Sequence, residues 1–301
     1  MTLSEVLGQP LAVTILQKSL ETGRLAHAYL FHGDEGVGKE TTVRILASDS
    51  LLRVVEGSPT IKIDQIRMLR EQSSYTQSSS LVWLIKDADQ MTVEAANAFL
   101  KVLEEPIPGV YFFLTTTNIH RVLPTIVSRC QVVPFRAIPE SIIQEYLTEK
   151  FGQAPDSPKV RLVARMARGS IGRAVEYWDG PILDRRREVL DKLIRIPTAS
   201  YPEVLGFSQA WDEDRAQVSE DLQLMLGWYR DLGAVKSGSR VGLYNPDYEN
   251  ELEKTSRFYS YMSIFEIMHE ISEMMAAIGG NARPRFALGR LFLTMKKGAQ
   301  S

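Results

Sequence analysis

The stretch Phe31–Thr41, with the sequence FHGDEGVGKET, contains the residue types that bind the phosphates of a nucleotide. An apolar run precedes it and a helical pattern follows it, which is the strand, glycine loop and helix order of a P-loop. Gly33, Gly36 and Gly38 let backbone N–H groups turn toward an anion, and the helix N-terminus adds a partial positive charge. Lys39 would then reach the outer phosphates. The pattern predicts a nucleotide site in this loop.

The predicted loop departs from the P-loop pattern at one position. Ser or Thr normally follows the lysine, where its hydroxyl helps to hold magnesium, but Glu40 stands here. Thr41 carries the next hydroxyl along the chain. Two interpretations therefore stay open: a site that binds ATP or ADP weakly through Gly36, Gly38 and Lys39, and a relic of the fold that binds nothing.

Composition and charge narrow the class of protein. The chain has 301 residues, of which 44% are hydrophobic and 24% charged, and its net charge is -2 at pH 7. These values are typical of an ordinary globular protein, without the global basic field that would by itself indicate a nucleic-acid partner. No apolar run reaches the roughly 20 residues that span a membrane. We expect a cytoplasmic protein of two or three domains, with no membrane partner.

Cysteine and histidine usage indicates no metal site. Cys130 is the single cysteine, which excludes a disulfide framework or a cysteine zinc cluster within the given residues and fits a reducing compartment. His27, His32, His120 and His269 are scattered along the chain, without carboxylate or thiolate partners at ligand spacing. From these residues we expect no bound metal.

The order of the predicted elements indicates an α/β protein with a parallel sheet. A continuous apolar run such as Leu81–Ile85 is typical of a strand that is buried on both faces of such a sheet. Strands are expected at residues 28–31, 52–55, 81–85, 110–114 and 131–135, with helical patterns between most of them. The first domain is therefore predicted as a doubly wound α/β domain over residues 1–136.

Beyond residue 136 the pattern is helical throughout. Three helical segments predict a small lid domain over residues 137–180. Asp179–Pro181 marks the next boundary, because Gly and Pro interrupt helices. Leu, Met and aromatic residues at helical spacing then predict an all-α domain over residues 181–301, in which Ser237–Asn250 is expected to be a loop.

Several short stretches, taken in order, resemble the clamp-loader branch of the AAA+ ATPases, and within it the delta-prime family of bacterial DNA polymerase III. They are VLGQ at 6–9, HAYLF at 27–31, the P-loop, IKIDQIR at 61–67, AANAFLKVLEEP at 95–106 and SRC at 128–130. A lone P-loop is a weak signal, whereas the ordered set is specific. The resemblance covers residues 1–180 and implies an AAA+ domain, a lid, and a C-terminal collar in a hetero-oligomeric ring.

The resemblance also implies that this chain does not hydrolyse ATP. Active relatives carry Asp-Glu at the end of the Walker B strand, where the first acid helps to hold magnesium and the second orients the attacking water. Here Lys86 and Asp87 stand at those positions, so a cation replaces the first acid and the second is one methylene shorter. With Glu40, both magnesium positions are altered. Hydrolysis should then lose most of the charge neutralisation on which it depends.

The same resemblance assigns roles to three further residues. In clamp loaders the arginine of the Ser-Arg-Cys motif acts in trans on the ATP of the neighbouring subunit, so Arg129 is expected to be an arginine finger and the one catalytic residue of this chain. Thr116 resembles the sensor 1 position and Arg173 the sensor 2 position. The full degenerate nucleotide-binding set is Gly33, Gly36, Gly38, Lys39, Thr41, Asp87, Thr116 and Arg173.

A zinc module is the point at which the chain departs from the family. Delta-prime and its relatives carry four cysteines between the P-loop helix and the next strand. Here Ala47–Ser50 joins these elements directly, without a cysteine. Zinc is therefore expected only if such a module is missing from the given chain near these residues.

The resemblance implies a non-hydrolysing stator subunit of the DNA polymerase III clamp loader, which lends Arg129 to a neighbour while the sliding clamp is loaded during DNA replication. Its partners would be the gamma/tau and delta subunits and, indirectly, the sliding clamp and primed DNA. It would belong to a polymerase holoenzyme without ATPase or polymerase activity of its own. Two alternatives stay open: an ATP-hydrolysing motor subunit of the gamma/tau type, and a nucleotide-sensing module outside replication.

Overall fold

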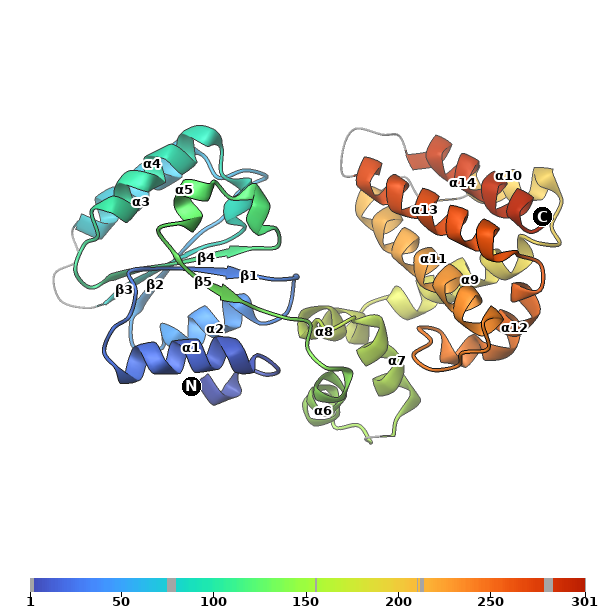
Figure 1. Ribbon diagram of the computed structural model, residues 1–301, viewed down its shortest axis with the longest axis horizontal. Helices are drawn as coiled ribbons and strands as arrows, with labels where there is room; N and C mark the ends of the chain where they lie inside the picture. The colour runs from blue at the N-terminus through green and yellow to red at the C-terminus, as the bar shows by residue number, and fades with distance from the viewer. Residues whose placement is uncertain are drawn as a thin grey trace. The chain divides into compact units, whose positions relative to one another are not determined.

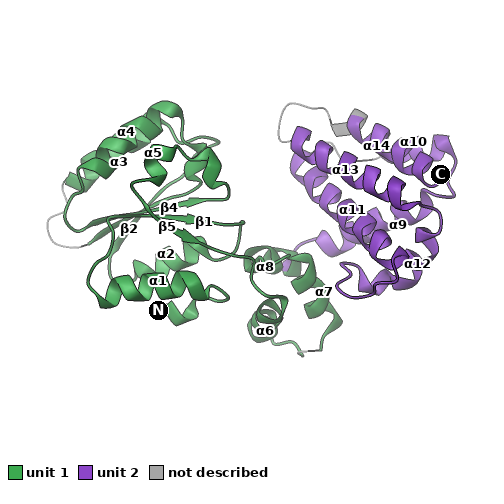
Figure 2. Cartoon of the chain, in the orientation of Figure 1, with its two compact units in different colours: residues 1–178 green, residues 179–301 purple. Residues whose placement is uncertain are grey.

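The computed structural model describes residues 3–74, 80–154, 156–209, 211, 214–278 and 284–300, the first three of the last range by their backbone only. The chain forms two compact units, residues 1–178 and 179–301 (Figure 2). Among the described helices, none is long and apolar enough to cross a membrane.

A five-stranded parallel sheet is the centre of the first unit (Figure 1). Its strands are β1 (Ala28–His32), β2 (Leu51–Val55), β3 (Leu81–Ile85), β4 (Val110–Thr116) and β5 (Gln131–Pro134). They lie in the order β2-β3-β4-β1-β5, and each neighbouring pair is parallel. All five carboxyl ends therefore share one edge of the sheet, and β1 lies between two neighbours. The predicted α/β class and the predicted strands are confirmed.

Helices cover both faces of the sheet, which explains why a central strand such as β3 is apolar throughout. On one face lie α1 (Pro10–Glu21) and α2 (Lys39–Leu46), and on the other α3 (Ile63–Ser74), α4 (Val93–Glu104) and α5 (Pro124–Val127) (Figure 1). Successive residues of β1 enter opposite cores, because side chains alternate across a strand. Leu30 belongs to the core with Trp83 and Phe99, whereas Tyr29 and Phe31 belong to the core with Phe113.

Short 3-10 turns complete this first unit: η1 (Leu3–Glu5), η2 (Ala88–Gln90) and η3 (Ile119–Arg121). The stretch 60–63 makes one isolated bridge, between Ile61 and Met91. Helix α3 already begins at Ile63. The apolar alternation of this stretch therefore reflects one buried side chain, Ile61, rather than a strand.

Three helices follow the sheet: α6 (Glu140–Phe151), α7 (Pro158–Met166) and α8 (Ile171–Asp179). The compact unit that contains the sheet extends through these helices to Trp178. The Ile138 amide donates a hydrogen bond of 2.9 Å to the carbonyl of Gly169, which fixes the chain entering α6 to the chain leaving α7. The division into a domain of residues 1–136 and a lid of 137–180 stays a prediction.

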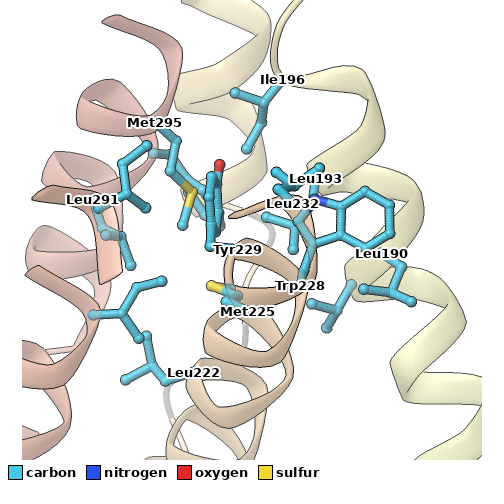
Figure 3. Close-up of a cluster of buried hydrophobic side chains, with 14 of the residues drawn as sticks. Leu190, Leu193, Ile196, Leu222, Met225, Trp228, Tyr229, Leu232, Leu291 and Met295 are labelled. Atoms are coloured by element: carbon cyan, nitrogen blue, oxygen red, sulfur yellow. The ribbon is translucent and has the colours of Figure 1, made fainter. Parts of the chain in front are cut away.

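The second unit is all-α, as predicted. Its helices are α9 (Ile182–Arg195), α10 (Tyr201–Gln209), α11 (Arg215–Lys236), α12 (Glu249–Ser256), α13 (Tyr261–Ile278) and α14 (Pro284–Gly298), with the turn η4 (Pro246–Tyr248). Helix α11 supplies the centre of the core with Met225, Trp228 and Leu232 (Figure 3). These side chains pack with Leu193 of α9 and Met295 of α14.

The predicted loop Ser237–Asn250 is tied to this core at its end. The carboxylate of Asp231, fully buried on α11, accepts hydrogen bonds from the Tyr244 amide (3.0 Å) and from the Asn245 amide and side chain (2.7 and 2.8 Å). The guanidinium of buried Arg186 donates to Asn245 Oδ1 at 2.8 Å. A buried carboxylate is stable only with such donors, so these hydrogen bonds hold the end of the loop against α11.

Replacing the carboxylate of Asp231 tests how much these hydrogen bonds stabilise the second unit. Asp231→Ala removes the acceptor of three buried hydrogen bonds and should lower the free energy of unfolding of the second unit by about 3 kcal/mol. Urea unfolding followed by the fluorescence of Trp211 and Trp228 measures it, since both side chains belong to this core. Asp184→Ala is the control, because that exposed side chain should contribute less than about 0.5 kcal/mol. Equal urea midpoints of unfolding for Asp231→Ala and Asp184→Ala would contradict a stabilising role of the Asp231 hydrogen bonds.

Candidate functional site

The P-loop joins β1 to α2 at the carboxyl edge of the sheet. Gly38 precedes the helix with a φ of 98°, a left-handed conformation that favours glycine. Because β3 and β4 end at the same edge, the residues that follow them lie beside the loop: Lys86 and Asp87 after β3, and Thr116 at the end of β4. The sheet topology therefore gathers three segments that are far apart in sequence.

The side chain of Lys39 is turned into its own loop. Its Nζ donates hydrogen bonds to the carbonyl oxygens of Gly33 at 2.5 Å and Asp34 at 2.6 Å, and only 7% of the residue is exposed. Burial lowers the pKa of this ammonium, an effect that nearby carboxylates, Asp87 first, oppose. A phosphate could recruit Lys39 only by breaking these two bonds.

The two residues that depart from the ATPase pattern contact each other. The ammonium of Lys86 lies 3.1 Å from a carboxylate oxygen of Glu40 and 3.2 Å from one of Glu56, which follows β2. Burial lowers the pKa of Lys86, but the hydrogen bonds to both carboxylates outweigh it, so the net shift is upward. The side chain stays charged at neutral pH and bridges two anions.

This bridge decides whether the site fits magnesium. In a P-loop enzyme, Mg²⁺ is held by the hydroxyl after the lysine and an acid at the end of the Walker B strand, together with phosphate oxygens. In this chain Lys86 already neutralises Glu40, and its positive charge opposes a second cation at the same place. The residues present do not fit a magnesium ion.

The two acids after β3 also differ from those of an active ATPase site. Asp87 has a left-handed φ of 48°, and its amide donates to the Thr115 hydroxyl at 3.2 Å. Burial, and next the charge of Asp89, raise its pKa, which Lys39 opposes. The hydroxyl of Thr116 donates to Asp89 at 2.6 Å, so the residue at the sensor 1 position is engaged by a carboxylate of its own chain.

The residues at the start of α8 contact the P-loop. The Gly172 amide donates to the Gly36 carbonyl at 3.1 Å. A Cβ atom at Gly36 would lie 2.2 Å from Ser170 Oγ, so only glycine permits this approach. The amide of Arg173 donates to the same hydroxyl at 3.1 Å, and its side chain is half-buried. The residue at the sensor 2 position thus lies on the segment that contacts the loop.

One of the predicted binding residues, Thr41, has other surroundings. Thr41 lies on the exposed side of α2, whereas the next residue, Thr42, is buried and its hydroxyl donates to the Gly38 carbonyl at 2.8 Å. The predicted sites missed Glu56 and Asp89, although each follows the carboxyl end of a predicted strand. That position was the available signal, because the carboxyl ends of parallel strands meet at one edge.

Arg129 lies between α5 and β5, and a second helix holds its guanidinium. Its Nη2 donates to the carboxylate of Glu104, the last residue of α4, at 2.7 Å, and its Nη1 donates to the carbonyl of Thr125 at 3.1 Å. The side chain remains 36% exposed. The next residue, Cys130, is largely buried, which raises the pKa of its thiol to about 12. That thiol is therefore protonated and unreactive at neutral pH.

The sheet separates Arg129 from the P-loop of its own chain. In the parallel register Tyr29 pairs with Gln131, so Arg129 precedes the amino end of β5. The P-loop begins beyond His32, at the opposite end of β1. Four residues of a parallel strand span about 13 Å. The guanidinium faces the edge of the sheet away from its own loop.

Metal-ligating side chains do not gather in the described part of the chain. Within it, no group of three or more His, Cys, Asp or Glu side chains could hold a metal ion. Between α2 and β2 lie only Ala47–Ser50, none of them a cysteine. Zinc therefore has no thiolate set in this chain.

Known proteins resemble this chain in sequence and in fold. The sequence profile of the family described as DNA polymerase III, delta subunit, matches residues 8–55 and 49–139. The chain is 27% identical over 322 aligned residues to DNA polymerase III subunit delta' of Bacillus subtilis (strain 168), which covers 96% of this chain and 97% of that protein. These matches relate the chain to the clamp-loader subunits of DNA polymerase III. The alternative interpretation, a nucleotide-sensing module outside replication, has no support from these relatives.

Other members and neighbours of the clamp-loader family match less of the chain or match it more weakly. DNA polymerase III subunit gamma/tau of Mycobacterium bovis is 32% identical over 200 residues, 56% of this chain and 35% of that protein. The RuvB Holliday junction branch migration motor of Thermotoga maritima has a TM-score of 0.51 at 17% identity, covering 83% of this chain and 89% of that chain. At that identity the likeness establishes the fold alone, a parallel α/β domain followed by helices.

Restoring the two altered positions tests the charge bridge. The double variant Glu40→Thr with Lys86→Asp should gain magnesium-dependent ATP binding, because it removes the resident cation and returns both ligand types. We expect magnesium to tighten its ATP affinity by at least tenfold, about 1.4 kcal/mol, in isothermal titration. Unaltered chain and Glu35→Thr, which changes an exposed loop acid, should show no such dependence. A double variant that ignores magnesium would contradict this account.

Proposed function

We propose that this clamp-loader subunit is the non-hydrolysing stator of its ring and supplies Arg129 to the ATP site of a neighbouring subunit. The observation that carries the first half is the Lys86 ammonium between Glu40 and Glu56. A hydrolytic site must place a divalent cation there to neutralise the phosphates. A fixed internal cation shared by two carboxylates cannot bridge phosphate oxygens in the same way.

The geometry of the P-loop supports the same conclusion. Lys39 is bonded to loop carbonyls, and Gly36 is in contact with the start of α8. Both contacts stabilise the loop without a ligand. Weak binding of ATP or ADP through Gly36, Gly38 and Lys39 would require these contacts to open, so the loop is better suited to hold the fold together than to turn over a nucleotide.

The second half of the proposal rests on the position of Arg129. It lies at the edge of the sheet opposite its own P-loop, and it is partly exposed. A guanidinium offers a fixed charge and a planar set of donors, which suits a γ-phosphate held by another chain. Its place in the chain favours action in trans over action on the degenerate site of the same subunit.

The proposed partners follow from the family. We infer that the chain assembles with gamma/tau and delta subunits, that its helical residues 181–301 form part of the collar, and that the complex acts on the sliding clamp and primed DNA. It would then work in the cytoplasm, as part of a polymerase holoenzyme and without polymerase activity of its own. The second candidate is a gamma/tau-like motor, favoured by the retained loop glycines and Lys39 and by the 32% identity to that subunit.

The two candidates differ in the activity of the isolated chain. As a stator it should hydrolyse ATP no faster than a Lys39→Ala variant, in the presence of magnesium and primed DNA. A phosphate-release assay with the gamma/tau subunit as the positive control measures this. Substantial hydrolysis that disappears in Lys39→Ala would establish the motor function instead.

The finger is tested in the assembled complex. Arg129→Ala should leave assembly intact and lower turnover at the one ATP site it faces by about 10³-fold, because a finger neutralises charge that develops in the transition state. The DNA-stimulated ATPase rate of the complex should fall by the fraction of the total rate that this one site contributes. Arg67→Ala is the control, since Arg67 is exposed and pairs only loosely with Asp64 at 3.2 Å. An unchanged rate with Arg129→Ala would end the trans-acting proposal.

A further inference from the structure

Glu104 lies in the motif at 95–106, but the resemblance assigns no function to its side chain, which makes the shortest contact of the proposed finger. Its carboxylate oxygen lies 2.7 Å from Nη2 of Arg129. We propose that Glu104 is a positioning residue that holds the Arg129 guanidinium ready for the phosphates of the neighbouring subunit's nucleotide. This inference rests on the trans-acting role proposed above.

The helix that carries Glu104 is packed firmly against the sheet. Glu104 ends α4, whose buried face includes Phe99, Val102 and Leu103. The ring of Phe99 packs edge to face on Phe112 of β4, with centroids 5.6 Å apart. The carboxylate therefore projects from a helix that is fixed against the sheet. A charge-assisted hydrogen bond from such a helix can set the direction of a long, flexible side chain.

A second contact fixes the plane of the guanidinium. Nη1 of Arg129 donates to the carbonyl of Thr125 on α5, at 3.1 Å, while Nη2 donates to Glu104. Arginine carries five N–H donors, so these two bonds leave others for an incoming phosphate. The exposed fraction of 36% keeps that part of the side chain accessible. This arrangement orients the guanidinium of Arg129 and leaves some of its N–H donors available to a phosphate.

Stability alone does not account for this pair. Half of the Glu104 side chain is exposed, and ion pairs of that kind contribute about 0–1 kcal/mol at most. Orientation has a larger effect on a reaction, because a group already held in place avoids the entropy cost of ordering it during the reaction. The neighbouring Glu105 shows the contrast. It is 79% exposed and lies 3.9 Å from Arg70, away from the finger.

The experiment uses the complex rebuilt with gamma/tau and delta subunits, the clamp and primed DNA. The Arg129-dependent ATPase is defined as the difference between the rates of the unaltered complex and the Arg129→Ala complex. In Glu104→Ala the kcat of this component should fall about tenfold with less than about twofold change in KM, the loss typical of removing a supporting contact. Glu104→Gln, which keeps an acceptor but loses the charge, should lie between. Glu105→Ala should match the unaltered complex.

A double-variant cycle separates positioning from a structural role. Glu104→Ala should cause no further loss in the Arg129→Ala background, because the effect passes through Arg129. A loss that persists there, an ATPase that rises in Glu104→Ala, or equal rates for Glu104→Ala and Glu105→Ala would each overturn the inference and leave the finger standing. If Arg129→Ala itself has no effect, the proposed function fails and the inference fails with it.

Discussion

The direction of the parallel sheet is the constraint on which the rest of the first unit depends. Because all five strands run the same way, their carboxyl ends bring the P-loop, Lys86 and Thr116 to one edge. The same constraint sends the end of α4 and the segment before β5 to the other edge, where Glu104 meets Arg129. One topological choice thus separates a degenerate loop from a partly exposed arginine. The proposed division of labour between two subunits is built into this geometry.

Charge pairing at the carboxyl edge explains how the P-loop fold accommodates the two altered residues, Lys86 and Glu40. A lone lysine in place of an acid, or a lone glutamate in place of a hydroxyl, would leave a partly buried charge without compensation. Together Lys86 and Glu40 neutralise each other, and Glu56 shares the ammonium. The charges of these three side chains are therefore compensated within the fold. The buried ammonium of Lys39 is stabilised in a similar way, by hydrogen bonds to two carbonyl oxygens of its own loop.

The main elements could be predicted from the sequence because their signals are local. A strand buried on two faces must be apolar throughout, and Leu81–Ile85 and Val110–Leu114 meet that requirement. The short apolar alternation at 60–63 could not be resolved from the sequence, because it fits both one buried side chain and a strand. The end of the loop at 237–250 could not be foreseen either, because Asp231 and Asn245 lie far apart in sequence and only packing pairs them.

The sequence by itself determined the α/β class, the P-loop, the motif set of a clamp-loader subunit and the two changed residues, Glu40 and Lys86. These are properties of residue type and spacing, which need no knowledge of contacts. Only the tertiary structure decided that the two changes form one salt bridge, and that Glu104 holds Arg129. Such pairs join residues that are 46 and 25 positions apart. Their meeting depends on strand order and helix direction, which local patterns do not specify.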